Sequence, residues 1–103
     1  MKPAPILFVV LLRYLVPLDM ILALRPAHVD YLKQCYDNGT FLVSGPQVPR
    51  AGGLILARAA SRAALIETLE RDPFYVHKAI EYHVYGFEVN MCAPELENIL
   101  KPI

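Results

Sequence analysis

Continuous apolar segments along the chain alternate with stretches of helical periodicity. Residues 6–13 (ILFVVLLR) are rich in β-branched side chains and show no polar alternation, which is typical of a strand buried on both faces. Residues 40–44 and 54–58 predict two further strands, and the turn-forming residues 45–53 between them predict a hairpin with a long connection. Residues 82–90 predict a fourth strand that carries apolar side chains on both faces.

A long helix is predicted between the first two strands. Pro26 suits a first helical position because proline has no N–H to leave unpaired and its φ is already set, so the helix is expected to open at Arg25–Pro26. It is expected to end at Asn38–Gly39, because glycine readily adopts the left-handed conformation that stops a helix. His28 then lies one turn inside the helix. It shares a face with the residues at i+4, i+7 and i+8, which are Leu32, Cys35 and Tyr36.

A second helix is expected after Ser61, which is a good N-cap. It is expected to end near Arg71–Asp72, since Pro73 forces the residue before it out of the α region. Residues 74–80 predict an irregular connector, and residues 93–103 predict a short helix or an arm.

The apolar segment before the long helix allows more than one interpretation. Residues 17–24 (PLDMILAL) predict either a short helical turn or an apolar lid, separated from the long helix by Pro26. A membrane span over residues 6–24 is disfavoured, because Arg13 and Asp19 each cost roughly 2.5–3.5 kcal/mol near the centre of a bilayer. A signal peptide is also disfavoured, because no cleavage site of small residues follows the apolar run. We therefore expect a cytoplasmic protein without a membrane partner.

The predicted order βαββαβ indicates a ferredoxin-like α+β fold: a four-stranded antiparallel sheet with two helices on one face. We expect a single domain over residues 1–103, with a core at about 5–90 and a C-terminal arm at 91–103. The helices cover only one face, yet the first and fourth strands are apolar on both. Sheet-to-sheet packing in a homodimer, forming a dimeric α+β barrel, would bury the second face.

Composition, charge and residue spacing argue against several classes of function. The formal net charge is +0 and no basic run appears, so nucleic-acid binding is not expected. Cys35 and Cys92 form no C-x-x-C pair and are expected to be reduced thiols. His77 and His83 lack the spacing of metal ligands, and no dinucleotide or P-loop fingerprint is present. We therefore expect neither a metal nor a cofactor.

His28 and Asp72 are the candidate catalytic residues. A carboxylate beside an imidazole fixes its tautomer and stabilises the imidazolium, which makes the ring a competent general base. Asp72 suits this role because the following proline gives it a rigid turn. Each residue also has a purely structural interpretation, as a turn former or as a hydrogen-bonded core histidine.

Four further residues are candidates for substrate binding. Arg25 is one helical turn from His28 and is suited to hold an anionic group or an enolate oxygen. Ser44, at the end of the second strand, has a hydroxyl that can orient a substrate oxygen, and Gly45 and Pro46 follow it. A solvated arginine and an ordinary exit from the strand are the structural alternatives.

The chain resembles the YCII-related (YciI-like) family in the order and spacing of several short motifs. These are Arg25-Pro26-Ala27-His28, Gly39, Ser44-Gly45-Pro46, Gly52-Gly53 and Asp72-Pro73-Phe74. The resemblance implies a dimeric α+β barrel, related in fold to muconolactone isomerases, and a pocket where His28 and Asp72 form a catalytic pair. Two departures are the more apolar residues 18–24 and a short gap between Pro46 and Gly52.

Together, the residues and the resemblance favour a small cofactor-free enzyme of lyase or isomerase type, including dehydrochlorinase-like elimination. In this hypothesis it moves a proton on a small cyclic or enolisable molecule, with His28 as the base and Asp72 orienting it. The alternative is a non-catalytic dimeric module that binds a small molecule or serves as an accessory. In that case the same two residues form a structural hydrogen bond that seals the core.

Overall fold

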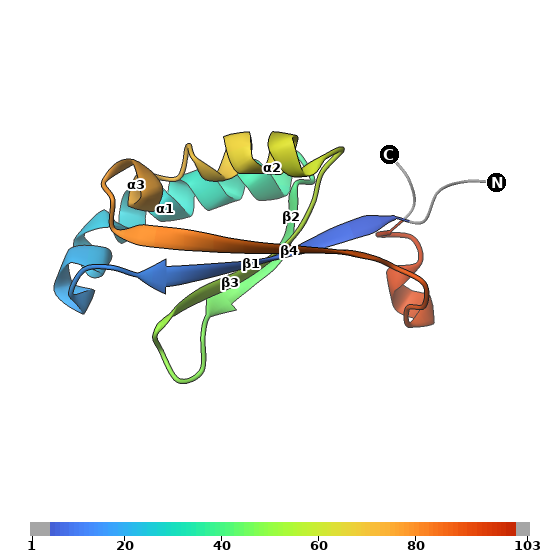
Figure 1. Ribbon diagram of the computed structural model, residues 1–103, viewed down its shortest axis with the longest axis horizontal. Coiled ribbons are helices and arrows are strands. Elements are labelled where there is room, and N and C mark those ends of the chain that lie inside the picture. The colour runs from blue at the N-terminus through green and yellow to red at the C-terminus, as the bar shows by residue number, and fades with distance from the viewer. Residues whose placement is uncertain (1–4, 101–103) are drawn as a thin grey trace.

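A computed structural model describes residues 5–100, and its elements follow the predicted order with one short helix added (Figure 1). The strands are β1 (Ile6–Tyr14), β2 (Phe41–Pro46), β3 (Gly52–Arg58) and β4 (Ile80–Glu88). The helices are α1 (Leu18–Asp37), α2 (Arg62–Leu69) and α3 (Pro73–Val76). A 3₁₀ turn, η1 (Pro94–Leu96), lies in the C-terminal segment.

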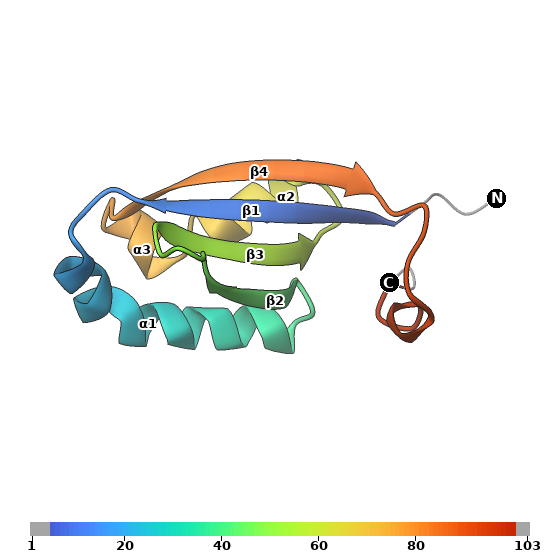
Figure 2. The ribbon, with the colours of Figure 1, turned by 90° about the horizontal axis from the view of Figure 1, so that it is seen from below.

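The four strands form one antiparallel sheet in the order β2-β3-β1-β4. The three helices lie on one side of this sheet (Figure 1). Figure 2 shows α1 running beside the β2 edge, while α2 lies behind the strands. This arrangement confirms the predicted ferredoxin-like α+β fold.

The face of the sheet that meets the helices carries the hydrophobic core. Phe8, Val10 and Leu12 of β1 belong to one buried cluster with Leu65 and Leu69 of α2. Burying a side chain of this size contributes roughly 1.5–3 kcal/mol relative to leaving it exposed. This cluster therefore holds the helices against the sheet.

The first helix begins earlier than the sequence predicts. α1 starts at Leu18, directly after Pro17, so the predicted opening at Arg25–Pro26 was wrong. A proline inside a helix costs about 3 kcal/mol through a lost hydrogen bond and a clash with the preceding turn. The N–H of Ile21 bonds to the carbonyl of Pro17 at 3.3 Å, and the Ile21 side chain is buried in the core. This anchored first turn lets the helix continue through the proline, and residues 17–24 therefore form no separate lid.

The other helix ends follow local rules more closely. Gly39 has φ +81° directly after the C-cap of α1, as the sequence predicts. The side chain of Ser61 accepts the N–H of Ala64 at 3.1 Å, which confirms the predicted cap of α2. That helix ends at Leu69, slightly before the predicted Arg71–Asp72. Within residues 5–100, no helix is both long and apolar enough to cross a membrane.

The connector after α2 is more regular than predicted. Residues 74–80 were expected to be irregular, but Pro73–Val76 forms the single turn α3. The side chain of Asp72 caps this turn by accepting the N–H of Phe74 at 2.9 Å. Pro73 at the first helical position needs no N–H partner. The cap, the proline at the first position and the buried Phe74 side chain therefore stabilise this helical turn together.

The sheet face opposite the helices is apolar over most of its area, with Arg13, Glu81 and His83 toward one end and Arg58 toward the other. Residues that lie directly opposite one another on neighbouring strands point to the same face. By this pairing the apolar residues of this face are Val9, Leu11, Val43, Leu54, Leu56, Tyr85 and Phe87. Val43 and Tyr85 are 57% and 58% exposed. The C-terminal segment is tied to the end of β3, where the Arg58 guanidinium donates to the carbonyl of Ile99. The sheet-to-sheet homodimer stays a prediction.

Candidate active site

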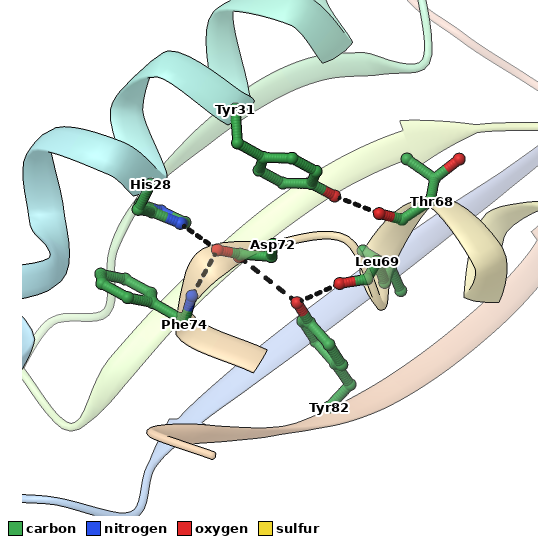
Figure 3. A network of polar contacts seen from close by, with 7 residues as sticks. All are labelled: His28, Tyr31, Thr68, Leu69, Asp72, Phe74 and Tyr82. Carbon is green, nitrogen blue, oxygen red and sulfur yellow. Dashed lines mark hydrogen bonds and ion pairs between the residues drawn. The ribbon is translucent and has the colours of Figure 1, made fainter. Parts of the chain in front are cut away.

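Helix α1 and the turn after α2 bring two predicted site residues together. Nδ1 of His28 lies 2.8 Å from Oδ1 of Asp72, although 44 positions separate them in the sequence (Figure 3). The side chain of Asp72 is 1% exposed and that of His28 is 13% exposed. The carboxylate is therefore shielded from water, and the pair is accessible only through the imidazole.

Asp72 is fixed by groups from three elements. Its Oδ1 accepts the N–H of Phe74 in α3, and its own N–H bonds to the carbonyl of Leu69 at the end of α2, at 3.1 Å. Tyr82 of β4 donates its O–H to the same Leu69 carbonyl at 2.6 Å, and its oxygen lies 3.3 Å from Oδ2 of Asp72 (Figure 3). A phenol has one proton, so the shorter bond to Leu69 is the stronger of these two contacts. The carboxylate therefore has little freedom to turn away from His28.

The imidazole of His28 is held between Asp72 and the ring of Phe74. The two rings are stacked, with centroids 3.9 Å apart and planes 10° apart. Because a carboxylate only accepts hydrogen bonds, the contact with Asp72 places the imidazole proton on Nδ1 and the lone pair on Nε2. Within residues 5–100, Nε2 has no hydrogen-bond partner. Every buried side-chain nitrogen or oxygen in this part of the chain does have one, so Nε2 is not buried. Nε2 is therefore accessible and free to accept a proton.

His28 lines a cavity of about 250 Å³ between α1 and the ends of β2 and β3. The four predicted substrate-binding residues line the same cavity: Arg25, Ser44, Gly45 and Pro46. Asp72 lies behind the imidazole, in contact with it. The structure thus brings all the predicted site residues into one neighbourhood, with Asp72 in the layer beneath the cavity wall.

The cavity wall is mainly apolar, with a few polar groups. Apolar residues of α1 make up much of the wall, together with Leu12 of β1 and Ile55 of β3, and Arg50 from the loop between β2 and β3 is a second arginine of the lining. The hydroxyls of Ser44 and Tyr36 are hydrogen-bonded to each other, which ties β2 to α1. A pocket of this kind holds an apolar ring and orients it through a small number of polar contacts.

Burial raises the pKa of two tyrosines near the pair well above the usual range, and for Tyr82 the charge of Asp72 is the next cause. Tyr31 donates its O–H to the carbonyl of Thr68 at 2.6 Å (Figure 3). Both phenols therefore remain protonated and serve as fixed donors. Burial also raises the pKa of the Cys35 thiol, so this sulfur is a core group and no ready nucleophile.

Three residues of the site were missed by the sequence analysis. Phe74 belongs to a motif that was noted, but nothing in the sequence indicates that its ring stacks on His28. Tyr82 was identified only as a strand residue. Arg50 lies in a turn-rich loop, and no sequence signal places it at the same cavity as His28, 22 positions earlier. Each of these contacts arises only when separate elements pack together.

The remaining histidines lie away from the pair. His77 is exposed at the end of α3, and His83 lies opposite Leu11 on the other sheet face, with its Nε2 3.4 Å from Oε1 of Glu81. No three histidine, cysteine, aspartate or glutamate side chains within residues 5–100 are grouped as a metal site requires. Histidine chemistry in this part of the chain therefore centres on His28.

The fold and the site together define an α+β protein with a His–Asp pair at a small apolar cavity. The pattern of the YCII-related domain family matches residues 7–88, and the chain belongs to this family. Among solved structures it is similar to 5-chloro-2-hydroxyhydroquinone dehydrochlorinase (TftG) from Burkholderia phenoliruptrix AC1100, in complex with 2,5-dihydroxybenzoquinone. The TM-score is 0.65 at 22% identity, over 77% of this chain and 90% of that chain, which supports the fold. A comparison with curated proteins found no match.

Proposed function

We propose that this protein is a small enzyme that transfers a proton on a small cyclic or enolisable molecule, as a lyase or an isomerase does, with no cofactor. The observation that carries the proposal is the 2.8 Å contact between Nδ1 of His28 and Oδ1 of Asp72. It leaves the second ring nitrogen free at a cavity. General-base catalysis by a positioned imidazole typically accelerates a reaction about 10²- to 10⁴-fold.

In the proposed reaction, Nε2 of His28 removes a proton from a carbon next to a carbonyl group. The electron pair of the broken C–H bond moves into the ring and onto the carbonyl oxygen, forming an enolate. Asp72 accepts the Nδ1–H throughout and stabilises the imidazolium. Arg25, three positions from His28 on α1, and the hydroxyl of Ser44 stabilise the enolate oxygen.

The enolate then has two outcomes in this proposal. An isomerase returns the proton from the imidazolium to a different carbon. In a lyase, the enolate electrons re-form the carbonyl and make a carbon–carbon double bond to the neighbouring carbon, whose bond to a leaving group such as chloride breaks. The imidazolium then releases its proton to solvent. Gly45 and Pro46 shape the wall against which the substrate lies.

The size of the cavity and the similar structure support a one-ring substrate. A volume of about 250 Å³ is at the small end for ligand pockets, which typically measure about 300–1,000 Å³. The similar protein TftG is named a dehydrochlorinase, and its structure contains 2,5-dihydroxybenzoquinone. Both points favour a substrate of about one six-membered ring.

The test is a comparison of two histidine substitutions. His28→Asn removes the proposed base, while His77→Asn changes an exposed histidine outside the cavity. Solvent-deuterium exchange at the carbon next to a carbonyl, followed by NMR on cyclic ketones and lactones, measures proton transfer before the full reaction is known. We expect exchange to fall about 10²-fold or more with His28→Asn and to be unchanged with His77→Asn. Equal rates for the two variants would show that His28 is not the base.

We also propose that a second copy of the chain covers the apolar sheet face, forming the dimeric α+β barrel. The exposed apolar side chains of β2, β3 and β4 on that face support this proposal. Val43→Lys places a charge there, whereas Val76→Lys places one on α3, at a valine of similar exposure (57% and 62%). Sedimentation velocity should show a dimer that Val43→Lys weakens and Val76→Lys leaves intact. A monomeric wild-type protein would contradict the proposal.

A further inference from the structure

The cavity wall holds two guanidinium groups and no carboxylate. Arg25 and Arg50 both line it, and no aspartate or glutamate among residues 5–100 does. In the same part of the chain the ion pairs are Arg13–Glu81, His28–Asp72 and His83–Glu81, so neither cavity arginine is neutralised by an acid. The chain as a whole is formally neutral. The positive charge at this cavity is therefore a local feature, unlike a generally basic surface.

The two arginines reach the cavity from different elements. Arg25 stands one turn from His28 on α1, which suits it to the oxygen next to the reacting carbon. Arg50 comes from the loop between β2 and β3. A ligand that fills the cavity therefore lies against one arginine from the helix that carries the base and one from the hairpin loop.

The loop that carries Arg50 is anchored on both sides. Gln47 donates its N–H to the carbonyl of Gly52 at 2.9 Å, and Tyr14 of β1 donates to the carbonyl of Ala51 at 3.3 Å. A Cβ at Gly52 would lie 1.7 Å from the carbonyl oxygen of Leu12, so the hairpin end packs directly on β1. The backbone next to Arg50 is thus held in place, which reduces the entropy lost when its side chain binds a ligand.

We propose that Arg50 binds a permanent anionic group of the substrate, so that the site selects a one-ring carboxylate or phenolate over a neutral ring. This inference names the substrate class of the proposed function. The reaction rests on that proposal, whereas the binding of an anion by Arg50 does not. The attraction comes from a guanidinium that no acidic side chain among residues 5–100 pairs with, beside apolar side chains that contact the ring. Arg25 remains available for the oxygen that becomes negative during the reaction.

The experiment compares benzoate with benzamide, a neutral ring of the same size, as ligands of the full chain in NMR titrations. Arg50→Met removes the guanidinium and keeps an apolar stem, while Lys33→Met removes a positive charge from the exposed side of α1, outside the cavity. We expect the wild-type protein to bind benzoate about tenfold or more tightly than benzamide. Arg50→Met should weaken the binding of benzoate by about tenfold and leave the binding of benzamide unchanged. Lys33→Met should change the affinity for neither ligand.

Three results would overturn the inference: equal binding of the two rings, no binding of benzoate, or an effect of Arg50→Met no larger than that of Lys33→Met. Proton transfer by the His28→Asn variant, measured beside the ligand titrations, separates this inference from the proposed function. If that variant loses turnover while wild-type protein binds both rings alike, the base assignment stands and the anion site does not. If benzoate is preferred through Arg50 while His28→Asn keeps full proton transfer, the anion site stands and the base assignment does not.

Discussion

The ring of Phe74 lies parallel to the imidazole of His28, with centroids 3.9 Å apart and planes 10° apart. The backbone N–H of Phe74 donates to Oδ1 of Asp72, the same oxygen that faces His28. One residue therefore supports both members of the pair, the imidazole through its side chain and the carboxylate through its backbone. A substitution at Phe74 changes the first of these contacts and preserves the second.

Phe74→Leu should consequently reduce catalysis more than it reduces stability. Loss of aromatic stacking costs about 0.5–1.5 kcal/mol beyond the change in buried area, so urea unfolding should show a moderate decrease in stability. Without the stacked ring the imidazole can tilt, and we expect turnover to fall about tenfold to a hundredfold. Unchanged turnover in a destabilised variant would mean that the stacking serves the fold alone.

Asp72→Asn tests the charge of the carboxylate separately from its hydrogen bonds. The amide oxygen can still accept the N–H of Phe74, so the cap of α3 is kept, but no negative charge remains to stabilise the imidazolium. We expect turnover to fall about 10²-fold or more. Asp72→Ala, which also leaves buried donors unpaired, should lower the free energy of unfolding by about 1–3 kcal/mol, more than Asp72→Asn does. An asparagine variant with full activity would contradict the proposed role.

The buried phenols predict a loss of stability in alkaline solution. Burial raises the pKa of Tyr82 above its ordinary value of 10.0, and that of Tyr31 likewise. The folded state then holds the phenol protons more tightly than the unfolded chain, so this contribution to stability is complete below pH 10 and decreases as the pH rises further, because the unfolded chain ionises first. The urea midpoint should follow this course. Tyr82→Phe should make the alkaline decrease shallower, and an unchanged slope would contradict the assignment.

Two glycines of the hairpin provide a matched pair of substitutions. Gly52→Ala places a Cβ 1.7 Å from the carbonyl oxygen of Leu12, which is backbone and cannot move aside without breaking the pairing of β1 with β3. Gly45→Ala meets nothing within 4 Å. We expect Gly52→Ala to yield little folded protein and Gly45→Ala to unfold near the wild-type urea midpoint. Equal stability of the two variants would contradict this account of the hairpin.

The apolar pattern was sufficient to predict the order of elements and the ferredoxin-like sheet. Continuous apolar residues at 6–12 favour burial on both sides. Ser61 and Gly39 act through short-range hydrogen bonding and backbone conformation, which can be read directly from a sequence. The start of α1 was not predictable in this way. There the local preference of Pro26 for a first turn was outweighed by the burial of Ile21, which depends on the packing of α1 against the sheet.

The sequence by itself therefore determined the fold class, the helix ends at Gly39 and Ser61, and the identity of the residues suited to acid–base chemistry, His28 and Asp72. The tertiary structure decided their contact, the exposure of Nε2, the stacking of Phe74 and the arrival of Arg50 at the same cavity. The physical reason is range. Caps and periodicity act over a few residues, whereas a site joins side chains from α1, the turn after α2 and the hairpin loop, whose separation is fixed only when the core between them packs.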